Sequence, residues 1–115
     1  MEPSAEACNQ LCPRFHTAVE LIGKRWSGAI VRLLLNGPVR FHDLRRAIPE
    51  ISDKMLSERL KELEAAGLVL RQVIPETPVR VEYRLTTKGQ ALEAPLNSIS
   101  VWAETWLSEP EPQPV

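Results

Sequence analysis

Cysteine, histidine and aromatic residues are scarce in this sequence, and their scarcity excludes several kinds of protein. The 115 residues include two cysteines, two histidines and 5% aromatic residues. Two cysteines cannot build a disulfide framework or a complete zinc site, and Cys8 and Cys12 have the spacing C-x-x-x-C instead of the C-x-x-C of thioredoxin-type proteins. We therefore expect neither a metal nor another cofactor.

Long apolar segments are also missing. No uninterrupted apolar run is longer than Leu33–Leu35, whereas a membrane-spanning helix needs about 20 apolar residues. The N-terminus has no basic region followed by an apolar stretch, so no signal peptide is expected. These absences predict a cytoplasmic protein without a membrane partner.

Neither sign of charge dominates the chain, but the charges are unevenly distributed. The formal net charge is −1, which argues against a uniformly basic nucleic-acid binder. Residues 14–46 hold seven cations and two anions, whereas residues 87–115 hold one cation and four anions. Such a chain can carry a basic face and an acidic end.

The length and composition predict one small globular domain. Hydrophobic residues make up 43% of the chain and charged residues 25%, and the length leaves no room for a catalytic barrel or a doubly wound sheet. We expect residues 12–107 to form the domain and residues 1–11 a flexible tail. Residues 108–115 are expected to be disordered, because prolines recur through this segment.

Hydrophobic periodicity and turn residues divide the domain into elements. Helices are predicted over residues 14–22, 26–35, 42–47, 53–66 and 87–107, with Pro95 kinking the last one. Extended segments are predicted at residues 39–41, 68–74 and 80–86, the last two as a hairpin. This order is that of a winged helix-turn-helix domain, a mainly helical α+β fold.

The helix predicted over residues 53–66 has two different faces. Leu56, Leu60 and Leu63 fall on one side and are expected in the core. An apolar back and a polar front suit a helix that enters the major groove of DNA, and a serine N-cap can also donate to a phosphate. The predicted DNA contacts of this segment are Ser52, Lys54, Ser57, Glu58, Arg59 and Lys61. The alternative is a plain amphipathic helix with a solvated face.

Four arginines outside this helix are candidates for phosphate contacts. Arg40, Arg45 and Arg46 flank the short third helix, which crosses the DNA backbone in a helix-turn-helix. Arg80 would belong to the wing formed with the loop at residues 75–79. The alternatives are scattered surface arginines and an ordinary hairpin in which Arg80 pairs with a neighbouring glutamate.

The last predicted helix carries an apolar stripe at helical spacing. The stripe consists of Leu92, Leu96, Ile99, Trp102 and Trp106. A terminal helix on a small domain cannot leave this much apolar surface uncovered, so a partner subunit is expected over it. Packing on the chain's own domain is the alternative for part of the stripe. Two-fold pairing would place two recognition helices roughly 34 Å apart.

Several motifs occur in an order that resembles the HxlR family of bacterial, MarR-like transcriptional regulators. They are Cys12–Pro13, Glu20–Trp26, Leu34–Arg46, Ile48–Ser52, Met55–Ser57, Leu60–Glu64, Gly67–Val69 and Pro78–Thr86. The similarity runs from about Cys12 to Trp102. It implies a homodimeric repressor or activator that dimerises through its first and last helices and binds inverted repeats in double-stranded DNA.

The resemblance also implies a role for a cysteine. In several members a cysteine just before the first helix senses oxidants or electrophiles, and Cys12 occupies that position, whereas Cys8 lies outside the family pattern. A helix start and the nearby Arg14 favour the thiolate of Cys12. Alternatively, Cys12 is a small buried hydrophobe at the dimer interface. For Cys8, an internal bond with Cys12, an intersubunit bond and no role all stay open.

An enzymatic function is not expected. His16 and His42 are far apart, and the chain has neither a glycine-rich phosphate loop nor an H-E-x-x-H motif. Cys12 with a histidine could start nucleophilic catalysis, but no third group to orient them is evident. Two competing hypotheses are a thiol redox enzyme and a protein–protein module with this fold that binds no DNA.

Overall fold

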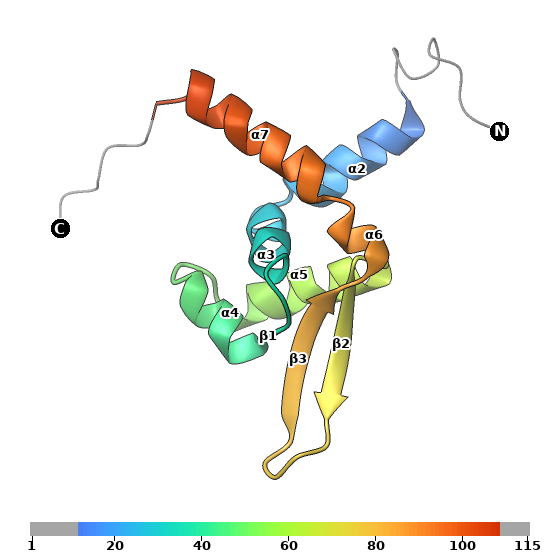
Figure 1. Ribbon diagram of the computed structural model, residues 1–115, viewed down its shortest axis with the longest axis vertical. Helices are drawn as coiled ribbons and strands as arrows, with labels where there is room; N and C mark the ends of the chain where they lie inside the picture. Colours follow the sequence, from blue (N-terminus) through green and yellow to red (C-terminus); the bar gives the residue numbers. More distant parts are fainter. Residues whose placement is uncertain (1–11, 109–115) are drawn as a thin grey trace.

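A computed structural model describes residues 12–108 and has the architecture of a winged helix-turn-helix domain (Figure 1). The elements are, in chain order, α2 (Pro13–Gly23), α3 (Ser27–Leu34), β1 (Val39–Arg40), α4 (Phe41–Ala47), α5 (Asp53–Ala65), β2 (Val69–Ile74), β3 (Arg80–Leu85), α6 (Thr87–Gln90) and α7 (Glu93–Trp106). The predicted mainly helical α+β fold is confirmed. No helix within the described residues is both long enough and apolar enough to cross a bilayer.

The core lies between α3, α4 and α5 on one side and a small sheet on the other. The three strands are antiparallel in the order β1-β3-β2, with Val39 opposite Tyr83 and Val69 opposite Leu85. The most deeply buried side chains are Ile30, Val31, Leu44, Ile51, Leu56, Leu60 and Leu63. The last three are the leucines predicted from helical spacing, so the inward face of α5 is confirmed.

Helix α5 begins and ends at signals visible in the sequence. The hydroxyl of Ser52 accepts a hydrogen bond of 3.0 Å from the backbone N–H of Met55, as an N-cap does. After the helix, Gly67 adopts a left-handed φ of 77°, which glycine tolerates without steric cost. The N–H of Leu68 then bonds to the carbonyl of Leu63, which closes a Schellman motif.

The C-terminal segment differs from the single kinked helix that the sequence predicts. The structure has two helices, α6 and α7, with a turn at residues 91–92. Pro95 lies in the first turn of α7, where a helix has no partner for the missing N–H. The proline therefore fits the start of a new helix and does not kink an existing one.

The second helix also begins differently from the prediction. Trp26 precedes α3 instead of opening it, with a left-handed φ of 78° that is uncommon for a residue with a side chain. Residues 24–26 therefore form a sharp turn between α2 and α3, which we call the α2–α3 turn. The hairpin β2–β3 extends from one end of the molecule, and α2 and α7 lie at the opposite end (Figure 1).

Candidate nucleic-acid interface

Helix α5 presents a polar face opposite its leucines. Lys54, Glu58 and Lys61 are exposed on it, Ser57 is half-buried, and Ser52 is exposed at the N-terminal end. Neither lysine forms an ion pair with another described residue, whereas most other cations nearby do. The helix is thus anchored by its apolar side and offers two uncompensated cations to a partner, as a helix in a DNA groove must.

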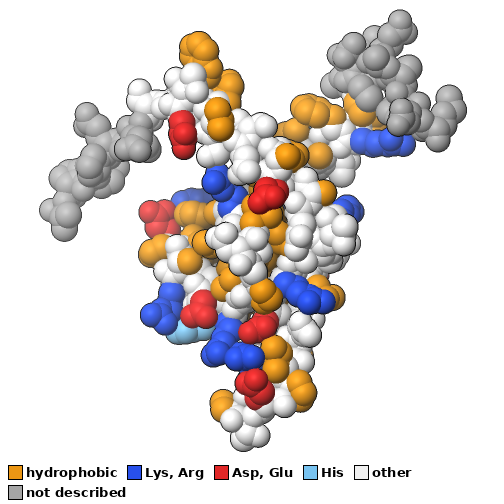
Figure 2. Space-filling view, in the orientation of Figure 1, with side chains coloured by type: hydrophobic (Ala, Val, Ile, Leu, Met, Phe, Trp, Pro, Cys, Tyr) orange, Lys and Arg blue, Asp and Glu red, His pale blue; other side chains and the backbone are white. Residues whose placement is uncertain are grey.

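The arginines around α4 divide into two kinds. Arg40 is exposed and pairs with no carboxylate among residues 12–108, and Arg46 lies 4.0 Å from Asp43 in an exposed pair. Arg45 is less exposed, and its Nε donates a 2.9 Å hydrogen bond to Asp53 at the start of α5. Arg40 and Arg46 are accordingly available to phosphates, while Arg45 joins the two helices of the helix-turn-helix. Figure 2 shows Lys and Arg side chains gathered around this part of the molecule, interspersed with acidic ones.

Arg80 at the start of β3 is held by two carboxylates. Its Nη2 lies 3.2 Å from Glu76 and its Nε lies 3.3 Å from Glu82, and the side chain is 29% exposed. This is the alternative in which Arg80 pairs with neighbouring glutamates. Because two carboxylates compensate its charge, the guanidinium of Arg80 is not available to a phosphate in this arrangement. The exposed residues of the wing include Val73 and Val79 instead.

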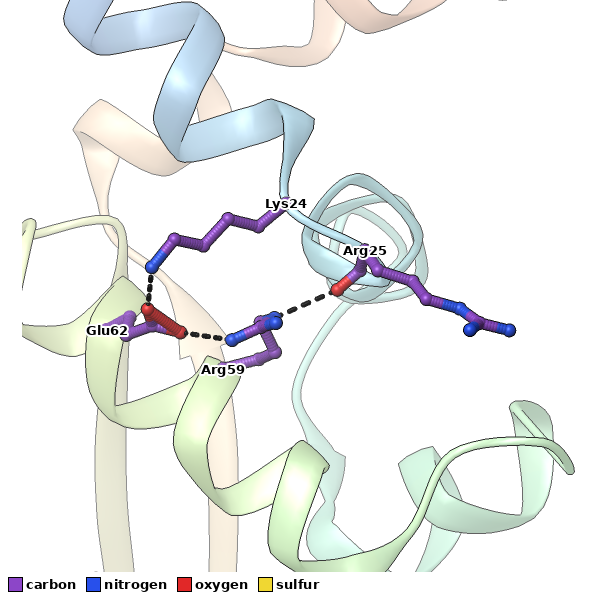
Figure 3. Close-up of polar contacts among 4 residues, drawn as sticks. All are labelled: Lys24, Arg25, Arg59 and Glu62. Atoms are coloured by element: carbon purple, nitrogen blue, oxygen red, sulfur yellow. Dashed lines mark hydrogen bonds and ion pairs between the residues drawn. The ribbon is translucent and has the colours of Figure 1, made fainter.

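Arg59 differs most from the sequence expectation, which places it among the DNA contacts. Its Nη1 donates to Glu62 at 2.7 Å and its Nε donates to the carbonyl oxygen of Arg25 at 2.9 Å (Figure 3). The side chain is only 16% exposed because it turns back across α5 toward the α2–α3 turn. The guanidinium of Arg59 is therefore engaged within the domain and is not exposed to DNA as the sequence predicts.

Glu62 is the centre of this group of contacts. Its second carboxylate oxygen accepts from Lys24 in the α2–α3 turn, so one carboxylate holds two cations (Figure 3). The Lys24 ammonium, and then the Arg59 guanidinium, lower the pKa of Glu62 below its ordinary value of 4.5. Sequence reasoning passed over Lys24 and Glu62. The spacing of three between Arg59 and Glu62 was the available signal, because such residues are neighbours on a helix.

Cys12 lies at the N-cap of α2 and is buried, with 6% of its surface exposed. Its carbonyl oxygen accepts a 3.0 Å hydrogen bond from the N–H of His16. The helix start expected after Cys12 is present, but the exposure that a sensing thiol needs is not, since the surrounding residues cover the side chain. This burial fits the alternative of a small buried hydrophobe. Cys8 lies outside the described residues.

The apolar stripe of the last helix is divided by the structure. Leu96 is buried and Leu92 is half-buried against the domain core, which fits the alternative of packing on the chain's own domain. Ile99, Trp102 and Trp106 are 56%, 56% and 72% exposed. Helix α2 has no buried residue and exposes Phe15 and Val19. The end of the molecule opposite the hairpin is therefore rich in uncovered apolar side chains.

Comparison with known proteins agrees with this geometry. The family model described as HxlR-like helix-turn-helix matches residues 21–111. The chain belongs to the HxlR family of transcriptional regulators.

Relatives of this HxlR-family protein include two from Bacillus subtilis (strain 168). The HTH-type transcriptional regulator YodB is 52% identical over 96 residues, covering 84% of this chain and 86% of YodB. The uncharacterized HTH-type transcriptional regulator YvaP is 54% identical over 99 residues, covering 86% of this chain and 92% of YvaP. Both similarities span the whole helix-turn-helix and hairpin.

Solved structures of regulators are similar to this one as well. The reduced form of YodB from B. subtilis has a TM-score of 0.80 at 49% identity and covers 86% of this chain and 97% of its own. The redox regulator HypR in its oxidised form has a TM-score of 0.78 at 34% identity, with coverages of 84% and 99%. The fold of this chain is thus the fold of solved transcriptional regulators.

Proposed function

We propose that this HxlR-family regulator binds an inverted-repeat operator as a homodimer, with residues 12–107 acting as one unit and α5 lying in the major groove. The proposal rests on the two different faces of α5. Leu56, Leu60 and Leu63 fix the helix to the domain, while Lys54 and Lys61 stand exposed on the opposite face without an ion pair to another described residue. Such a front can read base edges and neutralise phosphates.

Contacts to the DNA backbone are proposed from three further groups. Arg40 and Arg46 supply exposed cations beside α4, which crosses the backbone in this fold. The backbone amides at the N-terminus of α5 and the hydroxyl of Ser52 lie at a helix end that favours anions. Arg45 and Arg80 contribute only if a phosphate replaces their present carboxylate partners.

Helices α2 and α7 are proposed as the dimer interface. They expose Phe15, Val19, Ile99, Trp102 and Trp106, more apolar surface than a small monomer keeps in one region. We propose that the two-fold axis passes through this end in the direction that leaves both α5 helices on one side of the dimer. Their separation would then match one turn of DNA, roughly 34 Å.

A thiol response through Cys12 is the proposed regulatory property. Support comes from relatives, because YodB has been solved in reduced, diamide-treated and quinone-bound forms and HypR in reduced and oxidised forms. In this chain the effector would be an oxidant or an electrophile that reaches Cys12 at the start of α2. Burial of the side chain requires that local opening of α2 precede the reaction.

The deciding experiment is fluorescence anisotropy with a labelled duplex from the upstream region of the protein's own gene. We expect tight binding that exceeds binding to a scrambled duplex and weakens steeply with salt. Addition of diamide is expected to change the affinity of the unmodified protein and not that of Cys12→Ser. Binding that ignores both sequence and salt would contradict the DNA-binding proposal, and an unaltered diamide response in Cys12→Ser would contradict the role of the thiol.

A further inference from the structure

The two helices with different tasks, α2 and α5, are linked by a small polar network at the α2–α3 turn. Glu62 on α5 holds Lys24, and Arg59 on α5 holds both Glu62 and the carbonyl oxygen of Arg25 (Figure 3). Except for the Arg59–Glu62 pair within α5, these contacts join residues that are separated by more than thirty positions in the chain. We call these four residues the α5–turn link.

The link acts where α2 is otherwise weakly attached. Helix α2 has no buried residue, and only Leu21 and Ile22 in its last turn pack against the core. Between the buried Cys12 at its N-cap and this last turn, α2 is held by no buried side chain of its own, so its direction depends strongly on the backbone of the α2–α3 turn. That backbone contains the left-handed Trp26, whose ring lies 4.6 Å from the guanidinium of Arg25. A turn in an uncommon conformation persists when contacts around it hold it, and the link supplies such contacts.

We propose that Lys24 and Glu62 are positioning residues that fix the angle between α2 and α5 and thereby the half-site spacing that the dimer accepts. The proposal rests on the proposed function, in which α2 helps to form the dimer and α5 enters the groove. In a dimer, any rotation of α5 relative to α2 is applied to both protomers about the two-fold axis. One base pair of spacing corresponds to about 3.4 Å and about a tenth of a turn, so a modest rotation alters which operator fits.

If the α5–turn link only stabilised the fold, variants in it would give a different pattern of DNA affinities. Lys24 and Glu62 are 49% and 33% exposed, and ion pairs of this exposure add little to the stability of a domain. Variants in the link are therefore expected to fold. A loss of stability alone would weaken binding to every duplex by the same factor, whereas a loss of positioning would change the ratio between duplexes of different spacing.

The test measures that ratio. The unmodified protein first selects its preferred inverted repeat from a random duplex pool, and the central spacer is then lengthened and shortened by one base pair. Dissociation constants for the three duplexes are measured for the unmodified protein and for Lys24→Met, Lys24→Arg and Glu62→Gln. The control is Glu64→Gln, which makes the same substitution on α5 two positions after Glu62, at a carboxylate that forms no ion pair with another described residue.

We expect Lys24→Met and Glu62→Gln to reduce the preference for the selected spacing by at least about fivefold, the lower end of typical coupling between sites. Lys24→Arg keeps the charge and is expected to retain the preference, as is Glu64→Gln. Equal weakening on all three duplexes would overturn the inference while leaving the proposed function intact. Failure of the unmodified protein to select any paired half-sites would overturn both.

Discussion

Replacing the exposed lysines of α5 tests the orientation of the proposed recognition helix most directly. Lys54 and Lys61 are seven residues apart, which on a helix is close to two turns and about 10.5 Å along one face. Both are exposed and pair with no carboxylate among the described residues. Truncating either to alanine therefore removes a charge without leaving a partner unsatisfied, and the inward leucines stay in place.

The expected magnitude follows from counterion release. Each lysine that neutralises one phosphate contributes about 0.9 to the slope of the logarithm of affinity against the logarithm of salt concentration, so a dimer lacking one lysine per protomer loses about 1.8. Between roughly 50 and 200 mM salt, the unmodified dimer should lose about 12-fold more affinity than the variant does. A lysine that contacts a base edge instead would cost about 1–3 kcal/mol and relax the preference at that base pair.

The assay is anisotropy titration of Lys54→Ala, Lys61→Ala and the double variant at several salt concentrations. The control is Arg32→Ala, which removes the same charge from an exposed position on α3 beside Leu96 and Ile99. We expect the two lysine variants to bind more weakly with shallower slopes, and the control to match the unmodified protein. If both lysine variants keep the original affinity and slope, the polar face of α5 does not meet DNA.

Four further predictions concern the fold that supports the interface. Leu60→Ala, at a side chain that is 1% exposed, should lower the free energy of unfolding by about 2–5 kcal/mol in denaturant titration; a smaller loss would mean that the core closes around the cavity. Ser52→Ala should cost about 1 kcal/mol in the same assay by removing the N-cap of α5, and Ser52→Asp should restore it. Gly89→Ala should destabilise by about 1–3 kcal/mol, because its Cβ would lie 2.2 Å from the carbonyl oxygen of Leu68; an unchanged melting temperature would refute this packing. The pKa of Glu62 is lowered in the folded state, so the contribution of its carboxylate to stability is complete above pH 4.5 and is lost as the pH falls through the lowered pKa. The difference in the free energy of unfolding between the unmodified protein and Glu62→Gln should therefore shrink on acidification. A difference that stays constant with pH would contradict the ion pairs of Glu62.

Much of the candidate site was accessible from local sequence signals. The spacing of Leu56, Leu60 and Leu63 defined the inward face of α5, and its polar face follows by exclusion. Ser52 and Gly67 marked the two ends of the helix. These predictions succeed because periodicity and capping involve residues within a few positions of one another, whose relative placement helix geometry already fixes.

Other features were decided by which distant segments came together. The sequence placed Arg59 among the DNA contacts, and only its contacts with the α2–α3 turn show that it faces inward. The burial of Cys12 and the division of the stripe at Leu96 also depend on distant segments. The carboxylate partners of Arg80 are instead its neighbours in the chain, and the sequence already offered them as an alternative.

Local signals in the chain were therefore enough to predict the order of the helices and strands as far as β3, the core face of α5 and the family to which the chain is similar. The tertiary structure decided which charges are free to meet DNA and which hold the fold together. Long charged side chains reach many partners at similar energetic cost, so the packing of remote backbone decides whether a cation such as Lys24 meets a carboxylate on another element or stays exposed.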